Sequence, residues 1–416
     1  MRILFLNNIP INPILGGVER VTDTLARALI AKDGYVIYYL CGRVEPHHYH
    51  YLNYDFPAPL YMLPDYGFSN SRQNIGFYRK LLGELNIDIV VNQRGLSSGF
   101  DQMLSIGDVK KITVLHTKPN AMIDHDLSRM LFFSNSMKEQ IKKHIKIVLY
   151  PFFYFRTVYK AKRYLKITYR DLVQNSDAVV LLSDNDRIEF LSNGVNIGNK
   201  VLCGIPNPNT FPVEDNLSSA GKEKMLLYVG RLDPFDKNVI ALIKIWEKLY
   251  FKHREWKLVL VGDGSARKDI EEYVKKKNIK NVYLEGAKDS VADYYKKASF
   301  ICLTSFFEGW GMALTEGMAY GCIPFTFNNY GASSDIIDDG INGCLIPSYD
   351  LNKYASRLSE LMSNDEKRFK MSEAALEKVK RFSIENVVNM WDDLFHKLLE
   401  QDRAIGSETA NYNKFG

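Results

Sequence analysis

Two glutamates flank a glycine-rich turn in the second half of the chain. The stretch 304–324 reads TSFFEGWGMALTEGMAYGCIP, with Glu308 and Glu316 on either side of Gly309 and Gly311. A strand that ends before this turn and a helix that opens at it leave free backbone N–H groups, which favour an anion. Glycine also lets the backbone approach a phosphate closely. Glu316 lies roughly 7–8 Å along that helix, so two hydroxyl-binding carboxylates bracket the turn at about the separation of a sugar and a ribose in a nucleotide sugar. The alternative is a pair of solvated glutamates.

A second group of polar residues follows an earlier strand. The sequence YVGRLDPFDKN runs from 228 to 238 and places Gly230, Arg231 and Lys237 on the loop after that strand. Two cations beside a helix N-terminus would neutralise a leaving diphosphate, the charge that grows as a glycosidic bond breaks. The alternative is an ordinary surface arginine and lysine.

The first half of the chain carries two further candidates. Gly16 and Gly17 end the loop after the first apolar run, where Rossmann-like domains bind ligands. His116 ends the run ITVLH. The alternatives are a tight strand-to-helix turn and a structural histidine. The turn Gly262-Asp263-Gly264 is a weak nucleotide fingerprint, because the third glycine of G-x-G-x-x-G is missing.

The sequence predicts no metal site. The run HHYH at 47–50 lies in a loop rich in proline and tyrosine without a nearby carboxylate or cysteine pair, so a variable surface loop is the favoured interpretation. The five cysteines are scattered and form no C-x-x-C pair, which suits buried thiols in a reducing cytosol.

The elements that must position these residues alternate between short apolar runs and helix-length periodic segments, the pattern of α/β folds with parallel sheets. We expect eleven strands, near 3–6, 35–40, 88–91, 112–116, 178–183, 225–229, 257–261, 282–285, 299–303, 323–327 and 344–346. A polar linker divides them. The predicted parts are a Rossmann-like domain (1–205), a linker (206–222), a second Rossmann-like domain (223–382), a helix packing back toward the first domain (383–404) and a tail (405–416).

The segment 138–170 has an unusual composition. It holds ten lysines or arginines against one acidic residue, with eight interleaved aromatics. A cationic, aromatic helix pair suits the headgroup region of an anionic membrane, which predicts a peripheral place on the inner face. The alternative is a helix packed on the first domain with a solvated basic face. The formal net charge of +5 on 416 residues is too small to indicate nucleic acid.

The stretch around the two glutamates resembles the E-x7-E motif of glycosyltransferase family 4, commonly S-x-x-E-G-F-G-L-x-x-x-E-A-M-A-x-G-x-P. Trp310, Met312 and Gly317 replace the usual Phe, Leu and Ala, and none of these changes removes a polar ligand. The Arg231 loop is similar to the family's G-R-L-x-x-x-K-G, with one extra residue and Asn238 for the last glycine. The glycine loop of the first half is similar to the family's G-G-x-E-R.

The resemblance implies a retaining, metal-independent GT-B enzyme, with two Rossmann-like domains facing across a cleft. It implies transfer of a hexose-type sugar from a UDP-, GDP- or other nucleotide sugar to a saccharide or lipid-linked acceptor, without a cofactor, in the cytoplasm. The implied catalytic residues are Glu308, His116, Arg231 and Lys237. The implied donor-binding residues are Gly16, Gly17, Gly230, Gly309, Gly311, Met312, Ala313 and Glu316.

Other function classes stay open at this stage. The same two-domain fold hosts nucleotide-sugar epimerases, which would convert the donor without an acceptor. A non-catalytic binding protein would hold the donor and never release the nucleotide. A dehydrogenase would need the full dinucleotide fingerprint, which is missing. Bacterial surface polysaccharide or lipid-linked oligosaccharide synthesis, such as that of lipopolysaccharide or capsule, is the expected pathway.

Overall fold

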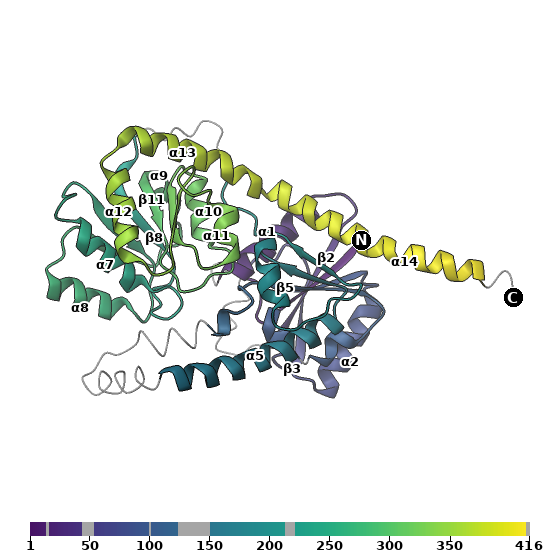
Figure 1. The fold of residues 1–416 in the computed structure, drawn as a ribbon. Coiled ribbons are helices and arrows are strands. Elements are labelled where there is room, and N and C mark those ends of the chain that lie inside the picture. Colours follow the sequence, from purple (N-terminus) through teal and green to yellow (C-terminus); the bar gives the residue numbers. More distant parts are fainter. Residues whose placement is uncertain (14–15, 44–53, 100, 124–149, 213–220, 413–416) are drawn as a thin grey trace. The chain divides into compact units, whose positions relative to one another are not determined.

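The computed structural model describes residues 1–13, 16–43, 54–99, 101–123, 150–212 and 221–412. The chain forms two compact units (Figure 1). The first comprises 1–116, 165–210 and 384–416, and the second comprises 117–164 and 211–383. The described residues 117–123 and 150–164 therefore cluster with the second unit, whereas the sequence prediction places them within a continuous first domain.

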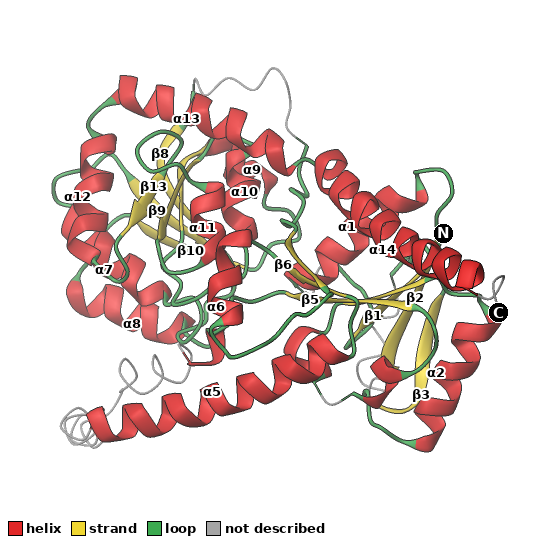
Figure 2. Ribbon diagram, turned by 45° about the vertical axis from the view of Figure 1, so that its right-hand side comes forward, coloured by secondary structure: helices red, strands yellow, loops and turns green. Residues whose placement is uncertain are grey.

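A seven-stranded parallel sheet forms the centre of the first unit, in the order β3-β2-β1-β4-β5-β6-β7 (Figure 2). Its strands are β1 (Arg2–Asn7), β2 (Val36–Arg43), β3 (Leu60–Tyr66), β4 (Ile89–Asn92), β5 (Lys110–Leu115), β6 (Ala178–Leu181) and β7 (Val201–Gly204). The inner strands are almost wholly apolar and buried, as expected for a parallel sheet covered on both faces.

Helices α1 (Gly17–Ile30), α2 (Arg72–Glu84) and α6 (Arg187–Leu191) contact strands of this sheet. The unit also contains α14 (Ile384–Tyr412) and the part of α5 (Tyr150–Gln174) that follows residue 164. The long helix α14 lies against α1, and the Asp392 carboxylate at this junction accepts hydrogen bonds from Lys32 Nζ (2.5 Å) and from the Tyr35 hydroxyl.

The second unit repeats this plan with a six-stranded parallel sheet, in the order β10-β9-β8-β11-β12-β13. Its strands are β8 (Glu223–Val229), β9 (Lys257–Val261), β10 (Val282–Gly286), β11 (Ala298–Cys302), β12 (Ile323–Phe327) and β13 (Cys344–Ile346). Its helices are α7 (Val239–Leu249), α8 (Arg267–Lys277), α9 (Ala292–Lys297), α10 (Met312–Met318), α11 (Gly331–Ile336), α12 (Leu351–Met362) and α13 (Asp365–Val379).

The structure differs from the sequence prediction at sheet edges and at the C-terminus. Strands β3 and β7 were not predicted, and both are edge strands of the first sheet. Strand β3 is half exposed and contains Pro64, which a central strand would exclude. Strand β7 is apolar, but it has only four residues. The predicted tail from 405 is wrong up to Tyr412, because α14 continues to that residue. No helix among the described residues is long and apolar enough to cross a membrane.

Candidate active site

The polar residues predicted in the second unit gather where the order of its strands reverses direction. Strands β8 and β11 are neighbours in the sheet, but the next strands along the chain, β9 and β12, lie on opposite sides of this pair. Such a position, called here a switch point, is where open α/β sheets bind ligands, beyond the carboxyl ends of the strands. The loop after β8 and the loop after β11 are joined there, because Phe306 N–H donates to Asp236 O (3.0 Å) and Thr304 Oγ1 donates to Asn238 O (3.0 Å).

Lys237 and Glu308 form an ion pair at this switch point. Lys237 Nζ lies 2.7 Å from Glu308 Oε1 and 2.9 Å from Oε2, and Ser305 Oγ donates a third hydrogen bond of 2.7 Å to Oε1. The side chains of Lys237 and Glu308 are 23% and 10% exposed. Two residues that lie 71 positions apart in the sequence are thus in direct contact, with the carboxylate held by two donors.

The backbone conformation and the close packing at position 311 both require a glycine there. Its φ of +85° is a left-handed conformation that favours glycine, and it precedes the first residue of α10. A Cβ atom at this position would lie 3.0 Å from the hydroxyl of Tyr330. Burial, and to a lesser extent the charge of Glu308, raise the pKa of Tyr330, so this hydroxyl stays protonated.

The loop that carries Arg231 is held by a close approach of two backbones. A Cβ atom on Gly262 would lie 1.9 Å from Gly230 O, and one on Gly264 would lie 2.6 Å from Leu232 O. The turn at 262–264 therefore needs its glycines to support the loop after β8. The Arg231 side chain is 67% exposed and its Nη2 lies 3.5 Å from Asp236 Oδ2, a weak pairing that leaves the guanidinium open to solvent.

Glu316 has a different environment from Glu308. It is 2% exposed and its Oε2 accepts a hydrogen bond of 2.9 Å from the hydroxyl of Tyr295, a fully buried residue. The next residue, Gly317, packs so closely on β11 that a Cβ atom would lie 2.9 Å from Ile301 Cγ2. This contact explains the glycine where the family usually has alanine. A role of Glu316 toward a ribose stays a prediction.

In the first unit, His116 follows β5 and is partly buried. Its Nε2 lies 2.6 Å from Oε1 of Gln93, which follows the neighbouring strand β4. Burial lowers the pKa of His116 to about 4, so the ring is neutral at physiological pH. Gly16 precedes α1, and Gly17 is its first residue.

Some of the sequence predictions concern residues that lie outside the described ones. The sequence analysis also missed some residues of the site. The run HHYH at 47–50 and residues 138–149 of the basic segment lie outside the described residues. Within the described parts of the chain, no three histidine, cysteine or acidic side chains are grouped so as to hold a metal ion. Tyr295 and Gln93 were missed because their only sequence signal is a polar group beside an apolar run, which many residues share.

Each of the two units contains a region that matches a model of a known protein family. The model described as "Glycosyltransferase Family 4" matches residues 15–201, and the model described as "Glycosyl transferases group 1" matches residues 213–378. The amylovoran biosynthesis glycosyltransferase AmsD of Erwinia amylovora is 23% identical over 287 residues, which cover 68% of this chain and 79% of the relative.

A second relative and a solved structure are also similar to this chain. A Campylobacter jejuni α-1,4-N-acetyl-D-galactosaminyltransferase, named for an undecaprenol-linked acceptor, is 32% identical over 218 residues, which cover 52% of this chain and 58% of the relative. The structure of HepE from Anabaena, solved with UDP and glucose, superposes with a TM-score of 0.71 at 14% identity and covers 95% of this chain and 100% of the other. The chain is a glycosyltransferase with the GT-B fold and belongs to glycosyltransferase family 4.

Proposed function

We propose that this enzyme transfers a hexose-type sugar from a nucleoside diphosphate sugar to a saccharide or lipid-linked acceptor, with retention of anomeric configuration and without a metal. The observation that carries the proposal is the contact between Lys237 and Glu308 at the switch point of the second sheet, with the exposed guanidinium of Arg231 on the same loop. The cations suit the diphosphate of the donor, and the carboxylate suits the hydroxyl groups of its sugar ring.

Each side chain has a specific part in this proposal. On donor binding, Lys237 exchanges its contact with Glu308 for the diphosphate, which Arg231 also neutralises. Glu308, still held by Ser305, then accepts hydrogen bonds from sugar hydroxyls. Gly230, Gly309 and the backbone amides of Gly311, Met312 and Ala313 border the diphosphate, and Glu316 binds the ribose.

Retention follows from attack on the same face as the leaving group. No second carboxylate is assigned to the reacting carbon, in contrast to the paired carboxylates of retaining glycosidases. The leaving phosphate therefore assists deprotonation of the acceptor hydroxyl, and the two cations stabilise the charge that develops on it. His116 and the loop ending at Gly16 and Gly17 bind the sugar from the first unit.

The proposed pathway is bacterial surface polysaccharide synthesis. Its support is the named activity of the relatives from Erwinia and Campylobacter, which act in amylovoran biosynthesis and on an undecaprenol-linked saccharide. A cytoplasmic enzyme at the inner face of the membrane would meet both a soluble donor and a lipid-linked acceptor.

A second part of the proposal is that α5 binds an anionic membrane surface. Between Arg156 and Arg170 this helix carries six cationic side chains, all exposed. Phe155 and Tyr159, one turn apart, are 71% and 69% exposed, while Leu165 and Tyr169 are buried. Exposed aromatics among cations suit the headgroup region of a bilayer, where aromatic rings enter the interface and cations meet lipid phosphates.

The donor site is tested by thermal unfolding of the purified chain with UDP, GDP, ADP and dTDP and their common sugar conjugates, with and without EDTA. One nucleotide should raise Tm in both conditions, because a ligand at about 100 times its Kd stabilises by about 2.7 kcal/mol. Lys237→Met and Arg231→Ala should remove the rise. No rise with any nucleotide would refute the proposal. Conversion of the donor without acceptor would indicate an epimerase, and binding without nucleotide release would indicate a binding protein.

The membrane contact is tested by co-sedimentation with vesicles that contain phosphatidylglycerol or only phosphatidylcholine. The triple change Lys160→Gln, Lys162→Gln and Arg163→Gln should weaken binding to the anionic vesicles about a hundredfold, at about 1 kcal/mol per charge. The same change at Lys275, Lys276 and Lys277 on α8, which are also exposed, is the matched control and should have little effect. Equal loss from both triple variants would contradict a specific role of α5.

A further inference from the structure

The first sheet has its own switch point, and it carries buried amide groups. Strands β1 and β4 are neighbours there, and β5 lies next to β4. Asn7 ends β1 and is 3% exposed, and Gln93 follows β4 and is 4% exposed. Neither Oδ1 nor Nδ2 of Asn7 has a hydrogen-bond partner among the described residues. Because an unpaired buried polar group is costly, an amide with two such atoms indicates a site whose partner comes from outside the chain.

His116, which contacts Gln93, supplies a third buried polar atom without a hydrogen-bond partner among the described residues. Gln93 Oε1 is an acceptor, so the Nε2 that lies 2.6 Å from it carries the proton. The neutral ring then has its lone pair on Nδ1. This Nδ1 is buried and also has no partner among the described residues. The switch point therefore offers the two N–H donors of Asn7 Nδ2 and two acceptor atoms, Asn7 Oδ1 and His116 Nδ1.

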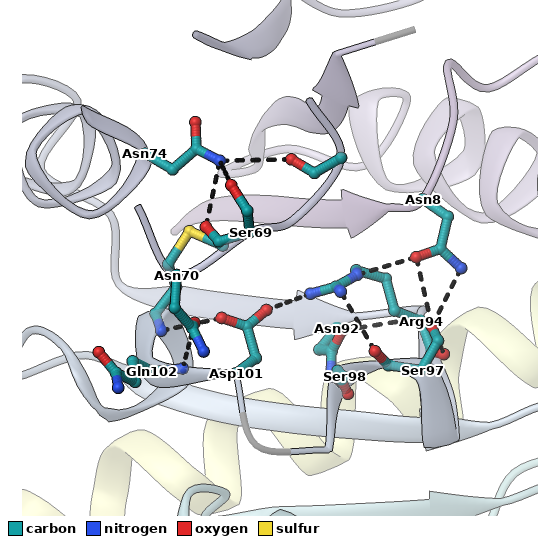
Figure 3. A network of polar contacts seen from close by, with 12 residues as sticks. Asn8, Ser69, Asn70, Asn74, Asn92, Arg94, Ser97, Ser98, Asp101 and Gln102 are labelled. Atoms are coloured by element: carbon teal, nitrogen blue, oxygen red, sulfur yellow. Dashed lines mark hydrogen bonds and ion pairs between the residues drawn. The ribbon is translucent and has the colours of Figure 1, made fainter. Parts of the chain in front are cut away.

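A polar network fixes the loops that carry these residues. Asn8 and Arg94 directly follow Asn7 and Gln93, and Arg94 Nε donates to Asn8 Oδ1 over 3.0 Å (Figure 3). Arg94 also pairs with the buried carboxylate of Asp101, and its guanidinium carbon lies 3.5 Å from the centre of the Phe68 ring. This network joins the ends of β1 and β4, so the positions of Asn7 and Gln93 are set before a ligand arrives.

From this arrangement we infer that Asn7 joins His116 in binding the hydroxyl groups of a sugar and that Gln93 is a positioning residue for His116. The inference rests on the proposed function. A hydroxyl both donates and accepts, so two or three hydroxyls satisfy all the unpaired atoms. The end of β1 lies two strand spacings, about 9–10 Å, from the end of β5, a span suited to a hexose and its substituents.

The test compares a nucleoside diphosphate with its sugar conjugate. Calorimetry measures the Kd of UDP and of UDP-glucose, or of the matching pair for whichever nucleotide raises Tm. Asn7→Ala and Gln93→Met should raise the Kd of the sugar conjugate about tenfold or more and change that of the free nucleotide less than about twofold. Asn193→Ala is the control, because Asn193 is also a buried asparagine of the first unit, but with hydrogen bonds to backbone carbonyls. It should leave both values unchanged.

The sugar can belong to the donor or to the acceptor, and kinetics separates these sources. If the hydroxyls are those of the acceptor, both donor Kd values stay unchanged and the acceptor KM rises in the variants at saturating donor. Equal weakening of nucleotide and sugar conjugate, or no change in any of these constants, would overturn the inference. Absence of nucleotide binding in the unmodified enzyme would instead refute the proposed function.

The role of Gln93 has a spectroscopic readout that a merely structural residue would not move. Long-range ¹H–¹⁵N spectra report which ring nitrogen of His116 is protonated. The proton should reside on Nε2 in the unmodified enzyme and in Gln93→Glu, which keeps an acceptor, and should distribute between both nitrogens in Gln93→Met. A proton on Nδ1 in the unmodified enzyme would overturn this assignment.

Discussion

The two sheets of this glycosyltransferase share one strand order around the switch point, but the side chains there differ in kind. In the second unit, Lys237 and Glu308 are charged and paired with each other. In the first, Asn7 and Gln93 are neutral amides, and Asn7 has no partner among the described residues. The same backbone topology thus presents an ionic site in one unit and a neutral hydrogen-bonding site in the other. The comparison suggests that topology decides where a ligand binds, while side-chain charge decides which part of the ligand binds.

The largest effect is expected from breaking the network that supports the neutral site. Arg94 and Asp101 are both buried, so Arg94→Ala leaves an uncompensated buried carboxylate. The Arg94→Ala substitution should lower the free energy of unfolding by about 3–5 kcal/mol. Urea denaturation measures this loss. Lys80→Ala, which removes an exposed lysine paired with Glu84, should change stability by less than about 1 kcal/mol. A loss for Arg94→Ala as small as that of Lys80→Ala would refute the structural role of this network.

The next effect concerns the ionic site. Lys237→Met removes the cation that we propose to face the leaving diphosphate. It should lower kcat/KM by about 10²–10³-fold, the usual loss for one transition-state donor. Lys244→Met, an exposed lysine on the adjacent α7, is the matched control. Steady-state kinetics at several donor concentrations checks both variants. Activity of Lys237→Met within about threefold of the unmodified enzyme would refute the assignment of the diphosphate to this switch point.

A smaller effect is expected at the glycine that supports the Arg231 loop. Gly262 has a φ of +142°, and a Cβ atom there would lie 1.9 Å from Gly230 O, so Gly262→Ala forces the loop to move. We expect a loss of about 2–3 kcal/mol in unfolding free energy, together with weaker nucleotide binding. Gly76→Ala in α2 meets no atom within 4 Å and should stabilise the chain by about 0.5–1 kcal/mol. Equal stability of the two variants would contradict this account.

The smallest effect, taken over a single pH unit, is a pH dependence that distinguishes the neutral site. His116 has a pKa of about 4 in the folded chain, because burial disfavours its charged form, and about 6.5 when unfolded. Between these values the unfolded state binds a proton that the folded state lacks. Stability is therefore lost as pH falls from about 6.5 toward 4, by up to about 1.4 kcal/mol per pH unit.

The measurement compares urea denaturation of the unmodified enzyme and His116→Gln at several pH values. The difference between the two curves removes the contributions of other groups, such as His253, whose pKa burial also lowers. The stability of the variant should fall less steeply as the pH falls through this window. Parallel curves would show that His116 titrates with its ordinary pKa.

The sequence alone determined the fold class, the family and nearly all central strands. Central parallel strands are apolar on both faces and follow one another at helix-length intervals, so a single sequence contains their pattern. The E-x7-E stretch and the Arg231 loop were recognisable for a similar reason, since glycines and charged residues at fixed spacing lie close together in the chain.

Tertiary structure decided which of those residues meet. The contact between Lys237 and Glu308 spans 71 residues, and that between Gln93 and His116 spans 23, so no local pattern predicts either. The burial of Glu316 against Tyr295 and the unpaired amide of Asn7 also depend on neighbours from distant strands. The physical reason is that strand order, not sequence distance, sets which loops share a switch point, and the strand order exists only once the sheets have formed.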